Sequence, residues 1–159
     1  LKAAAQADDG ARIVNVGTKI DTAMDFSDLN WEHRSYRMMA AYGQAKLGNI
    51  HFTRELARRL AGAGVTVNSV FPGVFLSNLG GTDGAQNWAL KLFAKTFGWA
   101  LPKPERAAER VLYLLTSDEV ADNSGEYFGG RQPIAAPQQA DDPAANAGIW
   151  RLSAELAGL

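Results

Sequence analysis

Tyr42 and Lys46 are the residues of this sequence whose types and spacing are best suited to acid–base chemistry. Side chains four residues apart lie on one face of a helix, so the phenol and the ammonium would be neighbours there. A phenol has an ordinary pKa of about 10, and a nearby cation favours its ionised form. The pair therefore suggests proton transfer coupled to hydride transfer.

Two short apolar strands and one long helix would have to position this pair. Residues 12–16 are rich in β-branched side chains and precede Thr18, which places a hydroxyl at the end of a strand. Residues 65–71 form a second predicted strand, which Pro72-Gly73 ends. The helix is expected from about residue 38 to 61, with Tyr42 near its start.

The order of predicted elements indicates an α/β fold with a parallel sheet. Further predictions are a helix end over 1–8, a functional loop over 21–37, a Gly- and Asn-rich loop over 74–87, helices over 88–97 and 104–116, a strand over 125–128, and an irregular stretch over 129–143. A last amphipathic helix carries Ile149, Leu152 and Leu156 on one face. In the long helix, one face is indicated by residues that recur at spacings of three and four: Tyr42, Ala45, Asn49, Phe52, Leu56 and Leu60.

Composition narrows the function classes. The 159 residues carry a formal net charge of −1, which argues against nucleic acid as a partner. There are no cysteines, and no apolar run approaches the roughly 18–20 residues of a membrane helix. His33 and His51 lack metal-ligand spacing and are expected to be surface or packing residues, so no metal site is predicted. We expect a cytoplasmic protein.

The motifs resemble those of the short-chain dehydrogenase/reductases. Residues 12–16, Tyr42-Gly-Gln-Ala-Lys46 and residues 71–78 carry this resemblance. Residues 25–30, 41–49, 52–60, 124–128 and 149–153 are similar to the retinol-dehydrogenase-like branch. The resemblance covers essentially the whole chain but only the C-terminal half of a family member. It implies that residues 1–159 are the catalytic half of one doubly wound, Rossmann-like domain whose N-terminal phosphate-binding half is absent.

The resemblance also implies roles for individual residues. Tyr42 would be the acid–base group, Lys46 would favour its phenolate form and bond the nicotinamide ribose, and Thr18 would orient the substrate oxygen. The cofactor would be NAD or NADP, and the substrate a small, apolar alcohol or carbonyl compound. The residues expected at the cofactor are Tyr42, Lys46, Pro72, Gly73, Val74 and Ser77.

The chain departs from the family pattern in three ways. Gly17-Thr18 stands where the family usually has two serines, and the extra methyl of threonine crowds the pocket. The active-site asparagine has no counterpart, and no Gly-rich phosphate loop appears between a strand and a helix. The alternative is therefore an inactive fragment or truncated homologue that acts, if at all, by binding a partner.

Several residues keep two interpretations. Thr18 could merely cap a strand end, and Ser77 could be a typical polar loop residue without a role at the cofactor. The aromatic cluster of Trp88, Phe93, Phe97 and Trp99 fits either core packing or an apolar substrate wall, and Trp150 is expected in the core. Arg54, Arg58 and Arg59 are expected on a solvated helix face or at a contact between copies of the chain. The resemblance implies that the long helix could support a homo-oligomer.

Overall fold

The fold is built around a four-stranded sheet in the order β1-β2-β3-β4. The structure is a computed structural model that describes residues 3, 5, 10–19, 22–73 and 104–159. The strands are β1 (Ala11–Val16), β2 (Val65–Phe71), β3 (Tyr127–Gly129) and β4 (Gln132–Pro133). The first three are parallel, and β4 pairs antiparallel with β3. The predicted α/β class with a parallel sheet is confirmed.

In the part of the chain that the structure describes, three bounded α-helices and two short 3-10 helices accompany the sheet. They are α2 (Met38–Arg59), α4 (Pro104–Thr116), α5 (Pro143–Leu156), η3 (Asp118–Val120) and η4 (Gln138–Asp141). The bounds predicted for β2 and α4 match the structure. The prediction of an irregular stretch over 129–143 is wrong where β4 and η4 lie, because β4 depends on pairing with β3. The expectations for residues 74–87 and 88–97 lie outside the described residues, as does most of 1–8.

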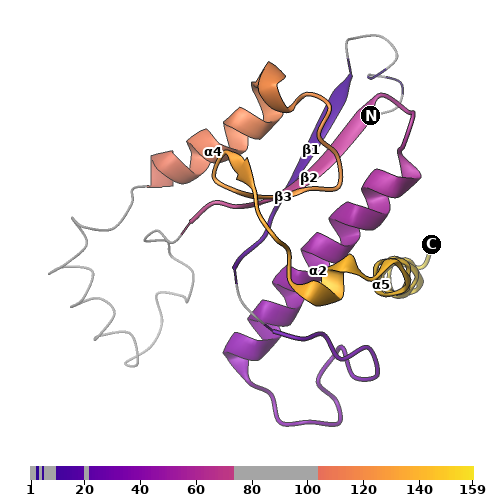
Figure 1. The fold of residues 1–159 in the computed structure, drawn as a ribbon. Helices are drawn as coiled ribbons and strands as arrows, with labels where there is room; N and C mark the ends of the chain where they lie inside the picture. The colour runs from indigo at the N-terminus through magenta and orange to yellow at the C-terminus, as the bar shows by residue number, and fades with distance from the viewer. Residues whose placement is uncertain (1–2, 4, 6–9, 20–21, 74–103) are drawn as a thin grey trace, which may run out of the picture.

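The sheet lies between two helical layers, with α4 on one face and α2 and α5 on the other (Figure 1). Successive side chains of a strand point to opposite faces of the sheet. The apolar side chains of β2 point to both faces, so helices cover both. Val65 and Val67 pack with Ala57 of α2, whereas Val70 packs with Leu114 of α4. Among the described residues, no helix is long and apolar enough to cross a membrane.

The face of α2 that packs inward differs from the face that its apolar spacing suggested. Ala45 is exposed, and Tyr42 and Phe52 are half-buried. Polar side chains make up half of the buried face, so hydrophobic periodicity does not detect it. The buried residues are Gly43, Gln44, Leu47, Ile50, His51, Thr53, Glu55 and Ala57.

The buried polar groups of α2 have partners nearby. His51 Nδ1 lies 2.7 Å from Asn146 Oδ1 on α5, and burial lowers the pKa of His51. The Glu55 carboxylate accepts hydrogen bonds from Arg58 and Arg59, and the bonds from Arg58 contribute most to lowering the pKa of Glu55 to about 2. Arg58 and Arg59 are exposed, as expected of a solvated helix face, and they also neutralise the buried Glu55 carboxylate.

The α5 side also corrects two expectations. Trp150 is half-buried, stacked on Phe52 with ring centroids 5.2 Å apart, and is not a core residue. Ile149 is buried as expected, but Leu156 on the same predicted face is 74% exposed. The apolar face of α5 therefore packs against α2 in its middle, whereas its C-terminal end is exposed.

Candidate active site

The predicted site residues lie at the carboxyl edge of the parallel sheet. Val16 pairs with Val70 at the end of β1, and the Gly17 N–H donates to the Val70 carbonyl at 2.8 Å. Thr18 therefore leaves β1 at the same edge where Pro72 and Gly73 leave β2. In open α/β sheets this edge is where ligands bind.

Two side-chain hydrogen bonds align helix α2 with the end of β1. Asn15 Nδ2 donates to Thr53 Oγ1 at 2.9 Å, and Asn49 Nδ2 donates to the Val16 carbonyl at 3.2 Å. The helix thus runs from the carboxyl edge of the sheet toward its amino edge. Lys46, three residues before Asn49, lies about 4.5 Å further along the helix axis, beyond the end of β1.

Tyr42 and Lys46 come together as their spacing predicts. The Lys46 Nζ lies 5.8 Å from the centroid of the Tyr42 ring, and both side chains are half-buried. No carboxylate in the described part of the chain pairs with the Lys46 ammonium. The pair is therefore positioned past the strand ends with its cation available to a ligand.

A second tyrosine illustrates what sets Tyr42 apart. Tyr127 on β3 is 1% exposed, and burial raises its pKa to about 12. A phenol that stays neutral and sealed from solvent is a poor candidate for proton exchange with a substrate. Tyr42 has the accessible surface that such exchange requires.

The turn after β2 is held by an arginine from α4. Arg110 Nη1 donates to the Pro72 carbonyl at 2.7 Å. Gly73 has φ +97°, and a Cβ added there would lie 2.5 Å from Arg110 Nη1. Glycine is needed at such a backbone conformation. Arg110 was not anticipated from the sequence, because nothing in the pattern of its helix separates it from other exposed charges.

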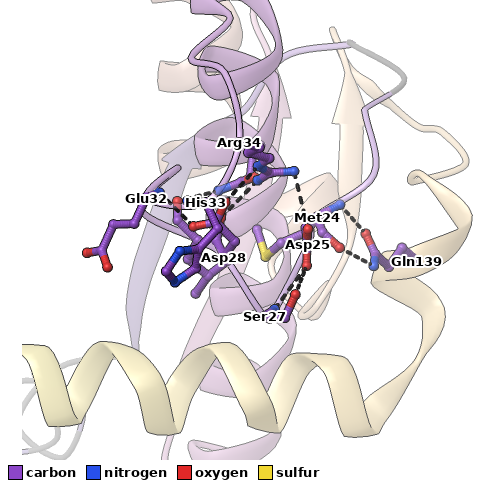
Figure 2. A network of polar contacts seen from close by, with 10 residues as sticks. Met24, Asp25, Ser27, Asp28, Glu32, His33, Arg34 and Gln139 are labelled. Carbon is purple, nitrogen blue, oxygen red and sulfur yellow. Dashed lines mark hydrogen bonds and ion pairs between the residues drawn. The ribbon is translucent and has the colours of Figure 1, made fainter.

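A folded loop between β1 and α2 fixes where the helix begins. Figure 2 shows its centre, the Asp28 carboxylate, which accepts the backbone N–H groups of Glu32 at 2.7 Å and His33 at 3.2 Å. Arg34 Nε lies 3.4 Å from the same carboxylate. The Gln139 amide anchors the start of the loop by bonding both the N–H and the carbonyl of Met24.

Gln44, inside the Tyr42–Lys46 segment, ties this loop to α2. Its amide nitrogen donates to the Leu29 carbonyl at 2.8 Å, and its oxygen accepts from Arg34 Nη2 at 2.7 Å. The N-cap residue of α2, Arg37, makes no side-chain capping bond. The Gln44 contacts therefore take over the positioning of the first turns, a role that the sequence motif did not reveal.

The remaining predicted site residues have different outcomes. Val74 and Ser77 lie outside the described residues, as does the aromatic cluster of Trp88, Phe93, Phe97 and Trp99. The roles of Thr18, Tyr42, Lys46, Pro72 and Gly73 stay predictions, although these five lie at one edge of the fold. Within the described ranges, no group of three or more His, Asp or Glu could hold a metal ion.

Comparisons with known proteins identify the class. A family model described as enoyl-(acyl carrier protein) reductase matches residues 6–128. Human retinol dehydrogenase 13 is 42% identical over 155 residues, covering 94% of this chain and 46% of its own length. Human retinol dehydrogenase 14 is 40% identical over 153 residues, covering 94% and 45%.

Solved structures agree with this result. A crystal structure of an uncharacterized protein from Mycobacterium paratuberculosis matches with a TM-score of 0.68 and 28% identity, over 92% of this chain and 50% of that one. The Pseudomonas aeruginosa RhlG/NADP active-site complex shares the fold with a TM-score of 0.50 and 21% identity, over 81% and 46%. The chain belongs to the short-chain dehydrogenase/reductase family, in its retinol-dehydrogenase-like branch. It spans about half the length of the curated relatives it matches.

Proposed function

We propose that residues 1–159 form the catalytic half of an NAD(P)-dependent oxidoreductase that interconverts an apolar alcohol and its carbonyl compound. The observation that carries the proposal is the Tyr42–Lys46 pair, with Nζ 5.8 Å from the ring centroid, at the edge where Thr18 and Pro72 leave the sheet. Membership of the family supports the general oxidoreductase class.

The described residues fit a nicotinamide cofactor. The Lys46 ammonium has no acidic partner in the described ranges, so it is free to donate to ribose hydroxyls. The Pro72-Gly73 turn, fixed by Arg110, offers backbone without a side chain at the same edge. Lys46, Pro72 and Gly73 would hold the cofactor, which when bound accepts or supplies the hydride.

The protein residues would handle the proton. In the reducing direction, the Tyr42 hydroxyl donates its proton to the substrate oxygen as that oxygen gains negative charge. The positive charge of Lys46 stabilises the phenolate that results. The Thr18 hydroxyl donates a hydrogen bond to the same oxygen and so orients the carbonyl group. In the oxidising direction these transfers reverse.

The test measures cofactor binding and turnover in the full-length protein. NADH and NADPH are titrated by calorimetry, and their oxidation is followed with a panel of apolar aldehydes and ketones that includes retinal, because the named relatives are retinol dehydrogenases. Loss of a hydrogen bond to a charged group costs about 1.5–3 kcal/mol, so Lys46→Met should weaken binding by about tenfold or more.

Lys46→Arg is the matched variant, because it keeps the charge but places it differently. We expect it to bind the cofactor more tightly than Lys46→Met and to turn over more slowly than the parent. A parent protein that binds neither cofactor would refute the proposal. It would favour the alternative of an inactive homologue.

A further inference from the structure

The end of β1 approaches β2 and β3 so closely that a side chain at position 17 would require its neighbours to shift by a few tenths of an ångström. Gly17 is buried, and a Cβ built there would lie 3.0 Å from Ser69 Oγ and 3.3 Å from Tyr127 Cε2. Contacts of 3.0 Å to a Cβ are well inside the ordinary van der Waals range of about 3.5–4.0 Å. The Ser69 hydroxyl therefore lies where a side chain at position 17 would begin.

The backbones on both sides of this contact are fixed. The Gly17 N–H donates to the Val70 carbonyl at 2.8 Å, and the Ser69 N–H donates to the Glu126 carbonyl at 2.9 Å. Asn49 bonds the carbonyl of Val16, the residue before Gly17. Ser69 is 0% exposed, and Tyr127 is 1% exposed. Neither strand can move away without breaking its ladder.

We infer that Gly17 and Ser69 act as one coupled pair that sets the position of the Thr18 hydroxyl. Gly17 and Thr18 share a planar peptide unit, so a shift of one Cα moves the next. A side chain at 17 would lift the strand end from Ser69 and carry Thr18 with it. Both members of the pair are thus positioning residues, and the inference rests on the proposed role of Thr18.

The pair has a distinctive prediction for a double-mutant cycle. Ser69 Oγ makes no hydrogen bond to another described atom, so Ser69→Ala removes the nearest obstacle and leaves no partner unsatisfied. Gly17→Ala alone should be damaging. Gly17→Ala combined with Ser69→Ala should recover most of the loss, since residues in contact are not additive.

The experiment measures kcat, KM and the melting temperature of the full-length protein and its variants at saturating cofactor. Because a misplacement of 1 Å can cost about 10²-fold, Gly17→Ala should lower kcat by about tenfold or more, and the double variant should return within about threefold of the parent. Ile50→Val is the packing control, because Ile50 Cγ1 lies 3.7 Å from the same Cβ position. It should lower the melting temperature and leave kcat within about twofold.

The outcomes separate this inference from the proposed function. A Gly17→Ala variant with the parent's kcat and melting temperature, or a double variant no better than Gly17→Ala, would overturn the coupling. Rescue of the melting temperature without rescue of kcat would overturn the positioning role while leaving the oxidoreductase proposal intact. A parent without turnover would refute the proposed function and the role of Thr18 together, and the melting temperatures would still report whether the two residues are coupled.

Discussion

At the scale of single residues, the Pro72-Gly73 turn depends on a backbone conformation that only glycine adopts without strain. Gly73 has φ +97°, and Arg110 occupies the space where a Cβ would be. Gly62 has φ +76°, and apart from its chain neighbours no atom of the described residues lies within 4 Å of its Cβ position. The two glycines therefore share the backbone requirement but not the contact with the site.

This difference leads to a prediction about alanine at the two positions. Gly73→Ala and Gly62→Ala should each destabilise the protein by about 1–3 kcal/mol, because each forces a non-glycine residue into a strained conformation. Gly73→Ala alone should also weaken cofactor binding, since it displaces Arg110 from the Pro72 carbonyl. Urea unfolding gives the stability, and calorimetry with NADPH and NADH gives the affinity. Equal affinities in the two variants would contradict the placing of this turn at the cofactor.

Residue 17 shows what a motif match cannot supply. By resemblance, serine is usual where this chain has Gly17, and the sequence alone leaves the exchange unexplained. The three-dimensional contact with Ser69, 52 positions further on, gives it a packing reason. Such a pair is visible only once β1 and β2 are in register.

At the scale of elements, the loop before α2 and the first turns of that helix form one structural unit. Asp28 organises the loop, Arg34 bridges it, and Gln44 joins it to the helix that carries Tyr42. The Arg34 guanidinium also lies 3.8 Å from the centroid of the Trp31 ring. Because Gln44 is 6% exposed, its two hydrogen bonds are protected from water.

Removing the Gln44 amide should therefore be costly. Gln44→Ala leaves the Leu29 carbonyl and Arg34 without this partner, for which we expect a loss of about 1–3 kcal/mol in the free energy of unfolding. Gln44→Glu keeps the acceptor for Arg34 but not the donor to Leu29, so it should fall between. Asn30→Ala is the control in the same loop, because its amide is exposed and its bond to Glu32 is 3.5 Å long. A Gln44→Ala variant no less stable than Asn30→Ala would refute the proposal that Gln44 holds the loop against α2.

Sequence patterns predicted the elements better than their contacts. The runs over 65–71 and 104–116 have strong local signals and match β2 and α4. The inward face of α2 was not predictable from apolar spacing, because Gln44, His51 and Glu55 are buried through partners distant in sequence or through local arginines. Likewise β4 exists only because β3 pairs with it. The Tyr42–Lys46 motif could be found in the sequence, whereas the groups that hold it in place could not.

At the scale of the whole molecule, stability should depend on pH through two buried groups. Burial lowers the pKa of His51 below its ordinary 6.5. As the pH falls below 6.5, the unfolded chain takes up a proton that the folded chain refuses, so stability decreases. Glu55 adds a second loss as the pH falls from 4.5 toward about 2, because protonation removes its bonds with Arg58 and Arg59.

The histidine contribution can be isolated by substitution. In His51→Gln the free energy of unfolding should change less between about pH 6.5 and 5 than in the parent, because the titrating group is gone. His33→Gln is the matched control, because it removes an exposed histidine of the loop. The slopes come from urea unfolding at several pH values. If His33→Gln and His51→Gln had the same slope, burial of His51 would not be the cause of the loss of stability at low pH.

The role of Tyr42 is tested most directly by hydride transfer in the full-length protein with Tyr42→Phe, measured as a single turnover of NADPH or NADH with an apolar carbonyl substrate. Tyr36→Phe is the matched control, since Tyr36 precedes the same helix and is 69% exposed. We expect Tyr42→Phe to slow the transfer by about 10²–10⁴-fold, the usual contribution of a general acid, with cofactor binding retained. Tyr36→Phe should stay within about twofold of the parent. A Tyr42→Phe protein that transfers hydride as fast as the Tyr36→Phe control would contradict the proposal that Tyr42 is the general acid.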